Sequence, residues 1–214
     1  MNYTIRRERS ADQRTVEEVT RLAFWNVYTP GCSEHYLVHV MRQHPDFVPE
    51  LDLVIEQDGR IIGNIMYTRA WLHDVHGERK SILTFGPVSI LPAWQRRGYG
   101  KRLIEHSFAA AKDLGFDAVV IFGNPANYVG LGFKSSHKYG VALAGGIYPS
   151  ALLAKELTAG ALGSGPWTYY ESAVYALDSE QAEAFDLDFP PLEKGWQASQ
   201  EEFYILSRSR IGEN

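Results

Sequence analysis

The sequence predicts an α/β (α+β) protein with a mixed, mostly antiparallel central sheet flanked by helices. An Asp58-Gly59 pair separates two apolar runs, which is the pattern of a tight antiparallel hairpin. A helical pattern over about 98–114 stands between the apolar runs 81–91 and 117–122. That strand–helix–strand order predicts a parallel pair with a right-handed crossover. The chain has 214 residues, 45% of them apolar, and is long enough to bury a substantial core.

The first elements are predicted to be a short strand and two helices. We expect the strand at 3–6 and a helix from Ser10, because Ser10 and Gln13 have the spacing of a capping box. This helix should end at Thr29-Pro30-Gly31. A second helix should begin after Ser33 and close before His44-Pro45.

Three strands are expected to form the centre of the sheet. Residues 51–56 and 60–71 flank the Asp58-Gly59 turn, where a type I′ geometry requires positive φ. Residues 81–91 are apolar on both faces, which is typical of a central strand. Pro87 has no N–H to donate, so a bulge or a local loss of pairing is predicted there.

The composition changes at about residue 138. A Gly- and Ala-rich stretch is followed by apparent strands at 169–177 and 201–210. We therefore divide the chain into a domain at 1–137 and a C-terminal extension at 138–214. The extension either completes the sheet or forms a small subdomain, and the sequence leaves both open.

Charge and cysteine content exclude several classes of protein. A net charge of −5 argues against general binding to nucleic acid or to membrane surfaces. The single cysteine, Cys32, excludes an intramolecular disulfide and has no activating residue pattern around it. No signal peptide or membrane-spanning run is recognisable, so we expect a cytoplasmic protein.

One basic stretch stands out in this acidic chain. In "QRRGYGKR", residues 95–102, four cations surround two glycines. A P-loop would need Gly at position 95 and Ser or Thr at 102, and a dinucleotide fingerprint would need Gly at 103, so both patterns fail. The remaining pattern, Gln/Arg-x-x-Gly-x-Gly at a helix start, predicts a diphosphate site on unpaired main-chain N–H groups. A solvated turn, or an RNA-binding patch with Tyr99 stacking on a base, is the alternative interpretation.

Two longer stretches give this loop a context. "FGPVSILPAWQRRGYGKRLIEHSFAAAKDLGF" and "VVIFGNPANYVGLGF" resemble motif A and the following Tyr-x-x-x-Gly-Phe element of the GCN5-related N-acetyltransferase (GNAT) superfamily. The resemblance follows the family order over about 3–133. It is strongest to bacterial predicted N-acetyltransferases with a C-terminal extension. Many members have Asn where Ile121 stands, so Asn124 is not assumed to contact the cofactor.

The resemblance implies the acyl-CoA N-acyltransferase (GNAT) fold and acetyl-CoA as co-substrate. The cofactor-binding residues that it implies are Val88, Ile90, Gln95, Arg96, Arg97, Gly98, Tyr99, Gly100 and Lys101. It implies Tyr128 as the catalytic acid for the leaving thiolate. A backbone N–H of Ile90 or Leu91 would stabilise the oxyanion.

The implied function is direct transfer of an acetyl group to a primary amine in a ternary complex. The alternative is a catalytically silent acyl-CoA-binding or sensor protein. The acceptor would be a small-molecule or peptide amine, and a homodimer is compatible with the sequence.

The general base and a metal site are weakly indicated. His73, Asp74, His35 and Glu34 are weighed as bases, and each is more typical of an ordinary surface residue. The pairs His35/His39 and His73/His76 lack a third ligand, so no metal is expected. Trp25 and Trp71 are candidates for the border of the acceptor pocket.

Overall fold

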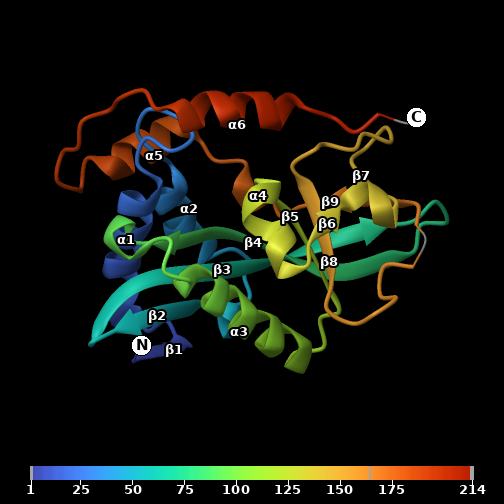
Figure 1. Cartoon of the computed structure of the whole chain (residues 1–214), viewed down its shortest axis with the longest axis horizontal. Helices are drawn as coiled ribbons and strands as arrows, with labels where there is room; N and C mark the ends of the chain where they lie inside the picture. Colours follow the sequence, from blue (N-terminus) through green and yellow to red (C-terminus); the bar gives the residue numbers. More distant parts are fainter. Residues whose placement is uncertain (1, 164, 213–214) are drawn as a thin grey trace.

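The computed structural model describes residues 2–163 and 165–212. They form a mixed, mostly antiparallel sheet with helices on both faces (Figure 1), and this confirms the predicted fold class. The main path of the sheet runs in the order β1 (Tyr3–Arg7), β2 (Leu53–Gln57), β3 (Arg60–His73), β4 (Arg79–Ile90), β5 (Ala118–Phe122), β8 (Leu152–Glu156) and β6 (Lys134–Ser135). Two further strands, β7 (Val141–Ala142) and β9 (Trp167–Tyr170), pair with each other, and β9 also pairs with β3.

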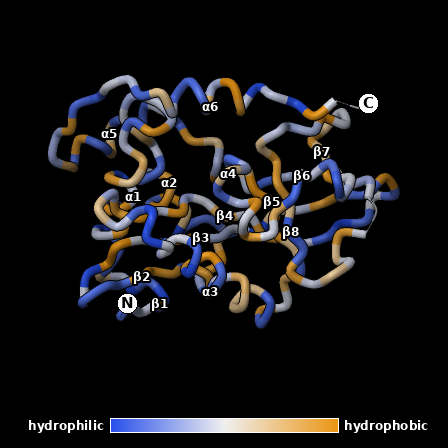
Figure 2. The backbone as a smooth tube through the Cα atoms, in the orientation of Figure 1, coloured by the Kyte–Doolittle hydropathy of each residue, from blue (hydrophilic) through white to orange (hydrophobic). Residues whose placement is uncertain are grey.

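A different helix covers each of the two faces of β3. Asn64 and Tyr67 of β3 have side chains on opposite faces because they are three residues apart along a strand. Asn64 accepts a hydrogen bond from Thr20 of α1 (Gln13–Phe24), at 3.1 Å, whereas the Tyr67 hydroxyl contacts Ser107 of α3 (Tyr99–Asp113) at 2.7 Å. Helix α2 (Glu34–Met41) lies beside α1. Figure 2 shows the apolar stretches in the interior, along β2 and β5 among other elements.

The turn and the bulge predicted from the sequence are both confirmed. Asp58 and Gly59 have φ values of 52° and 75°, as a type I′ turn requires. In the β3–β4 register Ile65 pairs with Val88 but Tyr67 pairs with Phe85. Two residues of β4, one of them Pro87, therefore oppose one residue of β3, which is a β-bulge.

The strands β4 and β5 separate toward their C-terminal ends. They are parallel, as predicted, but they pair only at Leu83 and Val119. Beyond that pair, β4 continues to Ile90 and β5 to Phe122 without pairing to each other among the described residues. The edge of β4 that faces β5 is consequently open from about residue 85 onward.

Four local predictions are wrong. The first helix, α1, ends at Phe24 rather than at Thr29-Pro30-Gly31. Ser10 and Gln13 form no capping box; instead Asp12 Oδ2 accepts a hydrogen bond from the Arg9 N–H at 2.8 Å. Residues 201–210 are mostly helix rather than strand, since they fall largely in α6 (Ala198–Arg208). The strand expected at 169–177 ends at Tyr170, and a 3₁₀ turn follows it at Ala173–Tyr175.

Part of the C-terminal extension crosses the loop between α1 and α2. We call this part, residues 186–203, the C-terminal strap; it follows α5 (Ser179–Asp186) and reaches into α6 (Figure 1). Asn26 is tied to it on both sides, because its Oδ1 accepts the Gly195 N–H at 3.1 Å and its carbonyl accepts Gln200 Nε2 at 2.9 Å. The Tyr28 ring stacks on Phe203 with 4.7 Å between centroids. No helix among the described residues has the length and apolarity needed to cross a membrane.

Candidate active site

The basic loop forms the start of α3. Gly98 has a φ of 83°, a left-handed conformation that favours glycine, and it is the N-cap of the helix. Arg102 is the first residue whose N–H bonds within the helix, to the Gly98 carbonyl at 3.1 Å. Within the described chain, the N–H groups of residues 96–101 have no main-chain acceptor. These unpaired donors, at the positive end of a 15-residue helix, form a site suited to an anion.

The side chains of this loop have different roles. Arg96, Arg97 and Lys101 are exposed, and the Lys101 ammonium lies 3.7 Å from the Glu105 carboxylate. Tyr99 is only 3% exposed and donates a hydrogen bond to Gln57 at 3.1 Å. It therefore contributes only its main chain to any ligand, and its predicted alternative role as a base-stacking residue for RNA is wrong.

Gln95 braces the loop against the end of β4. Its Nε2 donates to the Ile90 carbonyl at 2.9 Å. The Leu91 N–H donates to the Ile62 carbonyl of β3 at 2.8 Å, so Leu91 is not available as an oxyanion donor. Because the main-chain groups of an antiparallel strand alternate in direction, those of Val88 and Ile90 face the open edge toward β5.

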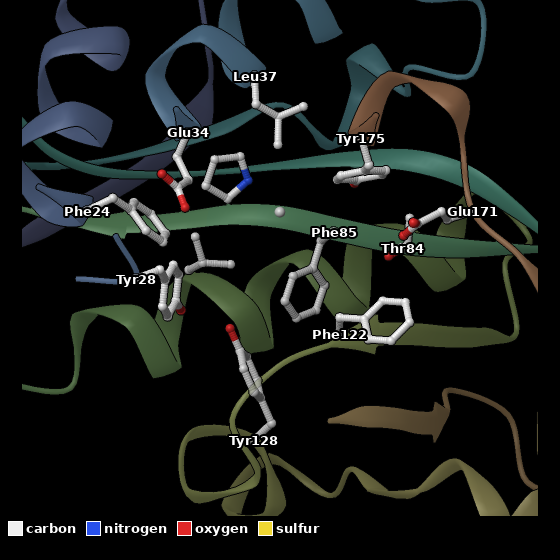
Figure 3. A pocket seen from close by; sticks show the side chains of 13 residues that line it. Phe24, Tyr28, Glu34, Leu37, Thr84, Phe85, Phe122, Tyr128, Glu171 and Tyr175 are labelled. Carbon is white, nitrogen blue, oxygen red and sulfur yellow. The ribbon is translucent and has the colours of Figure 1, made fainter. Parts of the chain in front are cut away.

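A cavity of about 180 Å³ opens beside this edge, between the separated strands (Figure 3). Its walls come from the end of α1 and the loop after it, from α2, from the bulge in β4, from the end of β5, from Tyr128 and from the C-terminal extension. The lining residues are Phe24, Tyr28, Glu34, Leu37, Thr84, Phe85, Gly86, Pro87, Val88, Phe122, Tyr128, Glu171 and Tyr175. Two of the predicted site residues, Val88 and Tyr128, are therefore brought together here.

Tyr128 ends the short helix α4 (Pro125–Tyr128), which Asn124 caps by accepting the Ala126 N–H at 3.0 Å. The Tyr128 ring packs on Phe85 and Phe133, with 5.8 Å between centroids in each case. Its hydroxyl points into the cavity (Figure 3) and has no hydrogen-bond partner in the described part of the chain. Burial raises the pKa of Tyr128, so the phenol keeps its proton at neutral pH.

Glu34 and Glu171 are the charged residues among those that line the cavity. Burial raises the pKa of both carboxyl groups. Burial also raises the pKa of Tyr28, and the nearby Glu34 charge adds to this effect. The sequence did not indicate Tyr28, Glu171 or Tyr175, because no local pattern links them to Tyr128. Glu34, expected to be an ordinary surface residue, instead lies half-buried in the wall of the cavity.

The other weighed residues lie elsewhere. His35 is buried, with Nδ1 3.4 Å from Cys32 Sγ and Nε2 3.0 Å from Asp186 Oδ1, and burial lowers the pKa of His35 to about 4. Burial raises the pKa of Cys32 to about 12, so this thiol stays protonated at neutral pH. Cys32 and Trp25 line a second cavity, on the α5 side of the loop.

His73, Trp71 and His39 lie outside the cavity and contact neighbouring side chains. His73 stacks on Tyr170, and Trp71 lies under the Arg79 guanidinium at 3.7 Å. His39 contacts Glu17 at 2.9 Å. In residues 2–163 and 165–212, no three His, Cys, Asp or Glu side chains are placed to hold a metal ion.

The family model described as "Acetyltransferase (GNAT) family" matches residues 21–133. This chain belongs to the GNAT acetyltransferase family. Among GNAT relatives, it is 28% identical over 136 residues to the uncharacterized N-acetyltransferase YjhQ of Escherichia coli K12, covering 62% of this chain and 70% of YjhQ. It is 29% identical over 103 residues to the uncharacterized N-acetyltransferase YhbS of the same strain, covering 48% of this chain and 59% of YhbS.

Solved GNAT structures share the fold. The complex of Escherichia coli YhbS with CoA superposes with a TM-score of 0.71 at 22% identity, over 83% of this chain and 93% of that one. A Brucella melitensis GNAT acetyltransferase in complex with acetyl-CoA gives a TM-score of 0.64 at 25% identity, over 81% and 98% of the two chains.

Proposed function

We propose that the protein is an N-acetyltransferase that moves the acetyl group of acetyl-CoA directly to a primary amine in a ternary complex. One observation carries the proposal. The unpartnered Tyr128 hydroxyl points into a cavity at the open edge of β4, and that strand leads into a helix start with unpaired N–H groups. The helix start that would bind the diphosphate and the cavity that contains the Tyr128 hydroxyl thus both lie along β4.

The chain's groups fit each part of acetyl-CoA. The N–H groups of residues 96–101 would hold the diphosphate, and the exposed Arg96, Arg97 and Lys101 would add attraction. The main-chain groups of Val88 would pair with an amide of the pantetheine arm, whereas the Ile90 carbonyl already accepts Gln95 Nε2 and leaves only the Ile90 N–H for the ligand. When bound, acetyl-CoA supplies an activated acetyl group as a thioester.

Three groups serve the transfer. Glu34 takes the proton that the bound ammonium must lose before its nitrogen can attack, and its raised pKa makes it a stronger base than an ordinary glutamate. Of the two predicted oxyanion donors, Leu91 is already bonded to β3, so the Ile90 N–H stabilises the oxyanion. Tyr128 donates its proton to the sulfur that leaves. A C–N bond forms, the C–S bond breaks, and CoA departs as a thiol.

The transfer is direct because Cys32 lies outside the cavity and keeps its proton. The alternative is a silent protein that binds acyl-CoA without transferring its acyl group. A thiol-release assay with acetyl-CoA and a panel of small and peptide amines separates the two. We expect thiol release that depends on the amine. Calorimetric binding of acetyl-CoA without release for any amine would establish the sensor instead.

A further inference from the structure

The cavity has a carboxylate at each end. Figure 3 shows Glu34 and Glu171 on opposite sides, with the Tyr128 hydroxyl between and below them. Neither an arginine, nor a lysine, nor a histidine is among the described lining residues. Glu171 makes no hydrogen bond or ion pair with any described residue, and Glu34 accepts the Ser33 N–H at 3.1 Å.

The walls between the two carboxylates are aromatic. Phe24, Tyr28, Phe122 and Tyr175 all line the cavity. Aromatic faces attract cations through their quadrupole, and they also contact aliphatic carbon. Glu34 is half-buried, whereas Glu171 is exposed at the rim of the cavity. Neither has a cationic partner among the lining residues, so a ligand that supplies positive charge is favoured. The lining therefore favours a ligand with a positive charge at each end and an alkyl chain between the two charges.

The two ends are not equivalent. Figure 3 shows the Tyr28 ring and the Tyr128 hydroxyl toward the Glu34 side of the cavity. Glu171 lies on the other side, together with Tyr175. The reacting amino group belongs at the Glu34 end, beside the catalytic phenol, and the Glu171 end is free to hold a second group.

We propose that the acceptor is a short aliphatic diamine, with its reacting amino group at Glu34 and its second, charged ammonium held by Glu171. This inference rests on the proposed function. Glu171 and Tyr175 lie outside the stretch 21–133 that matches the family model. The C-terminal extension thus supplies the second anchor, and the preference for a second cation is a property of this chain rather than of the matched domain.

Matched pairs of amines test the proposal on the full chain. The probes are propylamine against 1,3-diaminopropane and butylamine against 1,4-diaminobutane, each with acetyl-CoA in the thiol-release assay. We expect the kcat/KM of the diamine to exceed that of its monoamine by about tenfold or more, as for one charged hydrogen bond. Glu171→Gln should remove most of this ratio. Glu202→Gln, an exposed carboxylate on α6, should retain it.

Equal use of the two amines by the wild-type protein, or a ratio that Glu171→Gln leaves intact, would overturn the inference while the acetyltransferase stands. If no amine is acetylated, the proposed function fails, and calorimetry of 1,4-diaminobutane with the CoA-loaded protein decides the inference alone. Binding that Glu171→Gln weakens about tenfold or more supports it. Absent binding to the wild-type protein overturns it.

Discussion

The Tyr128 ring lies directly against the main chain of Gly123. A Cβ atom at position 123 would be 2.5 Å from Cε2 and 2.8 Å from Cδ2 of that ring. We predict that Gly123→Ala displaces the phenol and lowers kcat by roughly tenfold to a hundredfold, because small misplacements of reacting groups are costly. Affinity for CoA in calorimetry should change little. Gly130→Ala, with no heavy atom within 4 Å of its Cβ, is the matched control.

Removing the Tyr128 hydroxyl should affect chemistry rather than binding. Tyr128→Phe keeps the ring packing on Phe85 and Phe133. Loss of the proton donor should lower kcat by about a hundredfold or more while the dissociation constant of acetyl-CoA stays near its original value. Tyr204→Phe on α6 is the control, since that exposed tyrosine lies outside the cavity. Equal turnover by Tyr128→Phe would remove this residue from the mechanism.

The pH dependence of kcat/KM should reflect the protonation of Glu34. A general base acts in its deprotonated form, so kcat/KM should rise with pH through the Glu34 pKa, which burial raises above the usual glutamate range. We predict that Glu34→Gln abolishes this limb and lowers kcat by about a hundredfold or more. Rates measured from pH 5 to 9 with one amine give the limb directly. An identical profile in the variant would assign the base to another group.

Gly100 gives a test of the diphosphate site that does not disturb folding. A Cβ atom there would be 3.6 Å from Ile90 Cγ1, which is ordinary contact. We predict that Gly100→Val leaves the melting temperature nearly unchanged but weakens CoA binding by tenfold or more, roughly the loss of one charged hydrogen bond. Calorimetry and a thermal melt together check this. Wild-type affinity in the folded variant would place the diphosphate elsewhere.

A buried acid pair makes stability depend on pH. Burial raises the pKa of Asp52 to about 8, and the neighbouring Glu8 adds to this; Arg42 donates to Glu8 at 2.9 Å. The native state therefore binds more protons than the unfolded one, so this stabilisation is full below about pH 4 and is lost as pH rises through about 8. Asp52→Asn should flatten the pH dependence of the urea midpoint between pH 5 and 8. A midpoint with the wild-type slope would contradict the assignment.

Much of the central fold follows from local chemistry. The Asp58-Gly59 turn, the bulge at Pro87 and the left-handed Gly98 each require a backbone geometry that few residue types accept. The strand predicted at 201–210 failed for the opposite reason. Phe203, Tyr204 and Ile205 favour strands on propensity alone, but packing of Phe203 on Tyr28 fixes a helix there.

The sequence alone indicated only some of the residues of the candidate site. The loop 95–101 was indicated by its glycine pattern at a helix start, and Tyr128 by the resemblance to the Tyr-x-x-x-Gly-Phe element of the GNAT superfamily. Glu171 and Tyr175 lie more than 40 positions beyond Tyr128 and reach the cavity only through the pairing of β9 with β3. Nothing in their neighbours along the chain marks them, because their role comes from tertiary placement.

The contact of Tyr28 with Phe203 joins the C-terminal strap to the wall of the cavity that Tyr28 forms. Residues 95–101, by contrast, are held by side-chain hydrogen bonds to Ile90 of β4 and Gln57 of β2. Substitutions in the C-terminal strap would therefore change the cavity wall at Tyr28 while leaving residues 95–101 in place. In the proposed function, the C-terminal extension would set the choice of amine, and the loop 95–101 would bind acetyl-CoA.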